Sequence, residues 1–505
     1  MIKVFNAAGW SSPRQGNIWA GLIACLALTL AFGALAPAVA RAQAAGQEPP
    51  EPSIAVEGEE EEGDQEPVDP SESHQSAPIM VFKDPNAELA LDISKYPEIP
   101  GRMPTPAEID QVKAMAGSPL VNVDQNVITN VVNGMIAQLT NARNIQAAID
   151  PNDKTNPNSA AARAIQVSTQ HLLEPIFMAR AAKNVQFQAR YNQVLLQRLT
   201  PVLNHHLVPR IQAMIVLAQS ANPEALKVFL DEIQNPAQTV WVKLWAFRGI
   251  TNIKAQSGRL SASQEIDAAK IISDQLQANK NWPWPVQTRA LEALGALRQG
   301  FLPTSPRTAD MASVAFQYLI DLNMEPEVRA EAAKALGAMR VTTAVPRYNF
   351  ELAAYATAQL AADLGEDILD LSSDHRLHAQ KLTTLLIGPV FQAFEGVSTD
   401  RDSGFLRNPS LMNQNDVKKY IDALRPMAKS AVALMGAPTG QIPARTNELS
   451  QNLATFKEFL ANNPPADNRL FTGGPEYVPP AEPAQADAAA AAARSNVLAG
   501  AGGGR

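Results

Sequence analysis

The sequence PEVRAEAAKALGAM, at Pro326–Met339, decides the fold of this chain. Its apolar residues recur at spacings of four, four and three, which places them on one side of a helix. They are Val328, Ala332, Leu336 and Met339. Pro326 suits the first helical turn, where the missing N–H of proline costs nothing. Because this apolar stripe is narrow and rich in alanine, the helix needs close neighbours to bury it. We therefore expect a packed array of helices.

The same stripe recurs along the chain. Forty-two residues upstream, its four places are taken by Val286, Ala290, Leu294 and Leu297. The tetrapeptide Ala-Leu-Gly-Ala occurs in both stretches, with its glycine at Gly295 and Gly337. Further copies start at Val242 and Leu207, and a weaker copy starts at Leu382. Each stripe follows another expected helix, so the repeating unit is a pair of helices.

This repeat resembles the HEAT-repeat family of HEAT and armadillo-like α-solenoids. The resemblance rests on PEVRAEAAKALGAM and on PVQTRALEALGALRQ, and it is best over residues 207–340. It implies a curved, right-handed solenoid with first helices outside and second helices inside. It also implies binding of macromolecules along an extended concave face. A non-repetitive helical bundle is the alternative.

The expected fold class is all-α, because no stretch alternates well enough to be a strand. We expect an extended arm with a short helix at 79–123, a solenoid at 124–462 and a disordered Ala/Pro/Gly-rich tail at 463–505. Helices are expected at 125–149, 159–182, 185–203, 207–219, 223–234, 238–254, 262–279, 285–299, 308–322, 326–340, 349–371, 376–395, 415–435 and 446–461. His205 and His206 are interpreted as a loop or a helix entry.

Residues 1–44 are interpreted as a secretory signal peptide, with Lys3 and Arg14 before an uncharged apolar run at 18–39. Without cleavage, this run is long enough to anchor the chain in a membrane. The stretch ending at Cys25 also resembles a bacterial lipobox, which is a third alternative. Cys25 is the only cysteine, so no disulfide is expected in the mature chain. We expect an exported bacterial protein of the periplasm or cell envelope.

The net charge of −8 is unevenly distributed. Residues 46–77 hold eleven Asp and Glu residues and neither Lys nor Arg, which predicts a disordered acidic linker at 45–78. The first 45 residues carry three basic residues and no acidic ones, so the remainder is neutral overall. A neutral folded part does not favour a nucleic-acid partner.

The sequence carries no glycine-rich phosphate loop, nucleophile elbow or His-Glu-x-x-His motif, which predicts no enzyme activity and no cofactor. Asp374, His375 and His378 are the best candidate for a metal site, because residues three apart share a helix face. A third ligand is missing, and an N-cap role explains Asp374 equally well. We therefore expect no metal.

All four tryptophans after the signal lie at Trp241, Trp245, Trp282 and Trp284. Tryptophan is common at binding hot spots, and the starts of successive second helices line up along one edge of a solenoid. We expect Trp241, Trp282 and Trp284 to offer an aromatic surface for a partner, while Trp245 fills the core.

The favoured function is an exported, non-catalytic scaffold that binds a protein partner through an extended surface. One alternative is a binder of envelope polysaccharide that uses exposed aromatic side chains. The other is a periplasmic metal-binding or enzymatic module near Asp374–His378.

Overall fold

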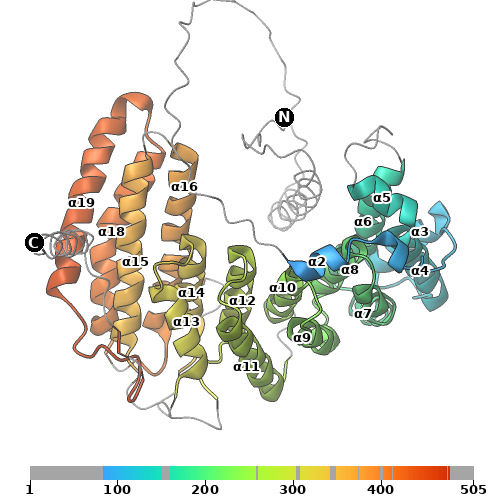
Figure 1. Cartoon of the computed structure of the whole chain (residues 1–505), viewed down its shortest axis with the longest axis horizontal. Coiled ribbons are helices and arrows are strands. Elements are labelled where there is room, and N and C mark those ends of the chain that lie inside the picture. Colours follow the sequence, from blue (N-terminus) through green and yellow to red (C-terminus); the bar gives the residue numbers. More distant parts are fainter. Residues whose placement is uncertain are drawn as a thin grey trace, which may run out of the picture. The chain divides into compact units, whose positions relative to one another are not determined.

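The computed structural model describes residues 84–149, 160–256, 260–302, 308–341, 348–372, 375–397, 402–411, 413–474 and 476–477. Within these ranges the chain is all-helical and forms no β-strand (Figure 1). None of the helices in this part is long and apolar enough to cross a membrane. The expected signal peptide, the acidic linker and residues 478–505 of the expected tail lie outside the described residues. The disordered tail expected from residue 463 is wrong for its described part, because Leu470, Phe471 and Tyr477 are buried.

The chain divides into two compact units. The N-terminal unit is Met1–Ser220 with Ala237–Val242, and the C-terminal unit is Ala221–Pro236 with Lys243–Arg505.

The N-terminal unit is built around one central helix. Its elements are α2 (Pro85–Leu89), η1 (Ile93–Lys95), α3 (Pro106–Gly117), α4 (Gln125–Thr140), α5 (Ala142–Ile149), α6 (Ala160–Ala181), α7 (Val185–Leu199), η2 (Thr200–Asn204) and α8 (Leu207–Ser220). Helix α6 packs against α3, α4, α5, α7 and α8. The buried Tyr191 of α7 donates its hydroxyl to the carbonyl of Leu172 in α6, at 3.0 Å.

The single helix expected at 125–149 is wrong, because the chain breaks at Asn141. This residue is extended, and its side chain accepts a hydrogen bond from the N–H of Asn144 at 3.1 Å. Asparagine thereby starts a second helix by replacing a missing backbone bond, as at an N-cap.

An extended segment, Tyr96–Thr105, runs along α4. A Cβ atom added to Gly134 would lie 2.5 Å from the carbonyl oxygen of Arg102 and from Cδ of Pro104. A Cβ atom added to Gly101 would lie 2.5 Å from the carbonyl oxygen of Asn133. Glycine at both places therefore lets the two backbones touch.

The C-terminal unit begins with helices in two rows. Its first elements are η3 (Pro223–Ala225), α9 (Leu226–Gln234), α10 (Val240–Gln256, from Lys243 on), α11 (Ala262–Ala278), α12 (Trp284–Leu297), α13 (Asp310–Ile320) and α14 (Pro326–Ala338). Helix α11 packs between α9 and α13 in one row, and α12 packs on α14 in the other. Arg248 of α10 is tied to Glu292 of α12 by an ion pair of 2.6 Å.

The unit ends in a bundle of longer helices. Its last elements are α15 (Phe350–Leu371), α16 (Arg376–Leu385), the π-helical turn η4 (Leu386–Val390), α17 (Phe391–Glu395), η5 (Phe405–Arg407), α18 (Asn415–Met435), η6 (Thr439–Gln441) and α19 (Ile442–Asn462). Helix α15 packs against α16, α18 and α19, and α18 packs against α19.

The helical stretch expected at 376–395 has these bounds in the structure, but the π-helical turn η4 lies inside it. Pro389 lies inside this turn. Proline cannot donate a backbone hydrogen bond, and its ring clashes with the carbonyl four residues earlier, so the regular ladder is disrupted there. A π-helical turn accommodates such a break.

The repeated apolar stripe is buried in every copy, as the spacing predicts. The buried residues are Leu207, Ile211, Ile215, Ala218, Val242, Ala246, Ile250, Ile253, Val286, Ala290, Leu294, Leu297, Val328, Ala332, Leu336, Met339, Leu382, Leu386, Val390 and Ala393. The glycine of Ala-Leu-Gly-Ala marks the helix crossings. A Cβ atom on Gly295 would lie 2.9 Å from Cα of Ala335, and one on Gly337 would lie 2.7 Å from Cα of Ala393.

Candidate partner-binding groove

The structure corrects one member of the expected aromatic surface. Trp282 and Trp245 are buried, and the ring of Trp282 lies 5.9 Å from that of Phe247. Trp241 is half-buried and belongs to the N-terminal unit. Trp284, at the first position of α12, is 41% exposed. Trp282 therefore fills the core, which corrects its expected place on the surface, and Trp284 is the exposed member in the C-terminal unit.

One face of Trp284 is already engaged. The amine of Lys381 in α16 lies 5.2 Å from the centre of its ring, within the range of a cation–π contact. The same amine forms an ion pair with Glu327 of α14. Trp284 thus helps to join α12, α14 and α16. The ring face that Lys381 covers is not free to contact a partner.

The candidate metal ligands are not supported by a third group. His375 and His378 are exposed at the start of α16, and Asp374 lies outside the described residues. The N–H of His378 donates to the carbonyl of His375 at 2.8 Å, which is a local helix-start contact. Across the described ranges, no group of three or more His, Cys, Asp or Glu residues could hold a metal ion.

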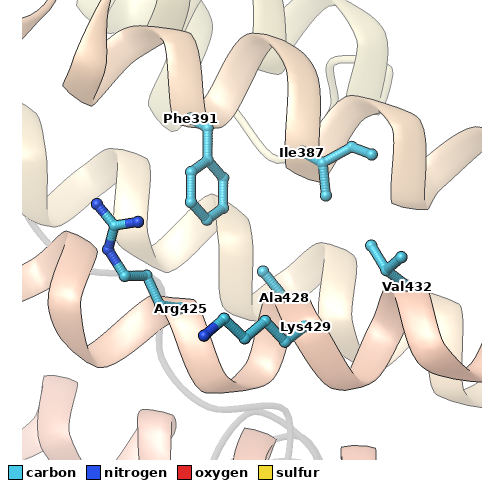
Figure 2. A pocket seen from close by; sticks show the side chains of 6 residues that line it. All are labelled: Ile387, Phe391, Arg425, Ala428, Lys429 and Val432. Carbon is cyan, nitrogen blue, oxygen red and sulfur yellow. The ribbon is translucent and has the colours of Figure 1, made fainter.

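An apolar groove lies between the η4–α17 segment and α18. Figure 2 shows Ile387 and Phe391 on one wall, facing Ala428 and Val432 on the other. Arg425 and Lys429 of α18 complete the lining, and the volume is about 260 Å³. Ile387 is 47% exposed and Val432 is 45% exposed. We call these six residues the α17–α18 groove.

Both walls of the groove carry a proline inside a helix. Pro389 lies in η4 and Pro426 lies in α18. Each proline interrupts the regular backbone ladder, and π-helical turns are frequent at functional sites. Next to Pro389, a Cβ atom on Gly388 would meet no atom within 4 Å, so the η4 wall is open to solvent there.

The two basic side chains of the groove differ in their surroundings. Arg425 forms ion pairs with Glu395, at the end of α17, and with Asp422, the latter at 3.7 Å. Lys429 is exposed and has no ion-pair partner in the described part of the chain. The groove therefore combines an apolar floor with one uncompensated positive charge at its rim.

The groove residues were not among the site residues expected from the sequence. Helices α16 to α18 show the usual buried stripes, which account for Leu386, Val390 and Leu424. Ile387 and Val432 are apolar residues on outward faces, as Leu377 is near the start of α16, and they lie on the two facing walls of the groove. Two such residues on neighbouring helices are the signal that sequence reasoning could have used, once the pairing of the helices was known.

A polar cluster in the N-terminal unit fixes the segment before α3. Nε2 of His205 lies 2.9 Å from the carbonyl oxygen of Pro97, and Nε2 of His206 lies 3.1 Å from that of Leu91. The N–H of Val208 donates to Nδ1 of His206 at 3.2 Å. Both histidines thus occupy the expected helix entry before α8, and their role there is structural.

Comparisons of the chain with models of known families, with curated proteins and with solved structures found no match. A functional interpretation therefore depends on the residues of the α17–α18 groove.

Proposed function

We propose that this protein is an exported, non-catalytic scaffold of HEAT-like helix pairs that binds a protein partner. Three features of the C-terminal unit support the solenoid part of the proposal. The first helices of successive pairs pack on one another, with α11 between α9 and α13. The second helices α12 and α14 also pack on each other. Gly295 lies where α12 crosses α14, and Gly337 lies where α14 crosses α17. A repeat protein is expected to show such packing between nearest neighbours, which supports the proposal.

The α17–α18 groove is the observation that carries the binding role. Ile387 and Val432 expose apolar surface at the same place, and the ring of Phe391 lies between the two helices (Figure 2). A groove between helices is a common receptor for protein segments.

Site-specific photo-crosslinking in the native host tests this function. A photoreactive amino acid replaces Val432 in one strain and Lys280, exposed in the α11–α12 turn, in the control strain. We expect a discrete crosslinked protein from position 432 alone, identified by mass spectrometry. The same products from both positions, or none from position 432, would contradict a binding role for the groove.

Export is tested on the same material. The N-terminal sequence of the mature protein, isolated from the periplasmic or envelope fraction, should begin near Arg41 or Ala45. An intact Met1 in the membrane fraction would instead establish an uncleaved anchor.

A further inference from the structure

We infer that the α17–α18 groove binds an amphipathic helix that places apolar residues on the floor and an acidic residue against Lys429. This inference rests on the proposed binding function and specifies the chemical class of the partner.

The floor of the groove has a helical repeat. Ile387 and Phe391 are four residues apart on one wall, and Ala428 and Val432 are four apart on the other. Four residues span about 6 Å along a helix axis, so each wall offers one contact per turn. An incoming helix with apolar residues at i, i+4 and i+7 presents the same spacing.

The walls disfavour the other common modes of recognition. An extended peptide adds to the free edge of a sheet, and neither η4–α17 nor α18 provides such an edge. A polysaccharide needs several polar partners, whereas four of the six lining residues are apolar. The chemistry of the groove therefore matches an apolar helix face better than a strand or a sugar.

The charge at the rim of the groove determines which residue the incoming helix should carry beside its apolar face. Arg425 is compensated by Glu395 and Asp422, so it adds little net charge to the rim. Lys429 adds one positive charge with no ion-pair partner in the described ranges. An acidic residue on the partner can pair with this amine, whereas a basic residue there is repelled.

Two labelled probe peptides test this assignment. Each is an alanine-based helix of about 16 residues, long enough to be helical alone, with leucine at i, i+4 and i+7. One carries glutamate at the flanking positions and the other carries lysine. Fluorescence anisotropy at low salt measures their affinity for the full mature protein. We expect the glutamate peptide to bind more tightly.

Three substitutions assign the binding to the groove. Lys429→Glu should weaken the glutamate peptide about three- to fivefold, the range of an exposed ion pair, and should strengthen the lysine peptide. Val432→Asp should weaken both peptides at least about tenfold by placing a charge on the apolar floor. Lys280→Glu is the matched control and should change neither affinity. Circular dichroism checks folding, and Ile387→Gln replaces Val432→Asp if that variant unfolds.

The outcomes distinguish a failure of this inference from a failure of the proposed binding function. If Lys429→Glu leaves both affinities unchanged, or neither peptide binds, the acidic-helix assignment is wrong, while crosslinking at position 432 still supports a binding role. If sedimentation shows that the protein dimerises and Val432→Asp makes it monomeric, the occupant is a second copy and the assignment is again wrong.

Discussion

At the scale of single residues, His206 shows how one buried side chain is tied to a single protonation state. Its neutral ring uses both nitrogens, one against the carbonyl of Leu91 and one to accept the N–H of Val208. Protonation places a second hydrogen where that N–H already donates. Burial accordingly lowers the pKa of His206 to about 4, and burial also lowers the pKa of His205.

This protonation state predicts loss of stability in mild acid. The unfolded histidine has a pKa near 6.5, so the unfolded chain binds more protons than the folded one between about pH 6.5 and 4. The free energy of unfolding should therefore fall by about 2 kcal/mol as the pH drops through this range. Urea unfolding at pH 7, 5.5 and 4.5 measures the change. His206→Gln keeps a donor and an acceptor without titrating, and its pH dependence should be shallower; an equally steep curve would assign the effect elsewhere.

A substitution at Leu336 tests whether the apolar stripe of Pro326–Met339 forms part of the core. It is only 2% exposed, between α14 and its neighbours. Leu336→Ala should lower the free energy of unfolding by roughly 2–4 kcal/mol, from lost burial and the cavity left behind. Leu322 is 53% exposed, so Leu322→Ala serves as a matched control and should cost less than about 0.5 kcal/mol. Chemical denaturation compares the two variants, and equal losses would place the core elsewhere.

At the scale of helices, most element bounds followed from apolar periodicity and proline positions. The helix expected at 415–435 is α18, and those expected at 207–219 and 262–279 match α8 and α11 within a residue. The departures from regular helices occur where a single residue competes with the periodic signal. Asn141 replaces a backbone bond with its side chain, and Pro389 widens a turn without ending the helix.

The site was harder to predict than the helices, because exposure depends on which faces meet. Trp282 and Trp284 are two residues apart, yet one packs on Phe247 and the other is exposed beside Lys381. Their local sequence, Trp-Pro-Trp-Pro, gives no sign of which ring is covered. The α17–α18 groove likewise depends on which faces of η4–α17 and α18 meet, and the sequence does not show that pairing.

Alanine substitutions at two glycines should change the stability of the protein in different directions, because only one of them lies at a helix crossing. Gly337→Ala would push its Cβ into the backbone of Ala393, where α14 meets α17. The overlap should outweigh the helix propensity gained, which is about 1 kcal/mol, and leave a net loss of about 1–3 kcal/mol. Gly388→Ala meets no neighbour within 4 Å and should be neutral or stabilising. Thermal melts of both variants test this, and a stable Gly337→Ala protein would show that the crossing is not tightly packed.

At the scale of the whole molecule, the N-terminal unit depends on a short piece of later sequence. The side chain of Asp84 accepts a hydrogen bond from the N–H of Val240 at 2.9 Å. The amide of Gln238 donates to the carbonyl of Leu203 at 3.1 Å, and its oxygen accepts from Arg210 at 3.3 Å. Residues 237–242 therefore complete this unit, although sixteen residues of the other unit precede them.

Two truncations test whether these contacts define a folding unit. A fragment of residues 45–256 keeps every contact named above and the buried helices around α6, so it should melt cooperatively with a helical circular dichroism spectrum. A fragment of residues 45–220 leaves Asp84, Leu203 and Arg210 without these partners, and it should melt at a lower temperature. Unsatisfied buried polar groups cost about 1–3 kcal/mol each, so the difference should amount to several degrees. Equal melting temperatures would show that residues 237–242 add nothing, and an unfolded 45–256 fragment would show that the unit needs the rest of the chain.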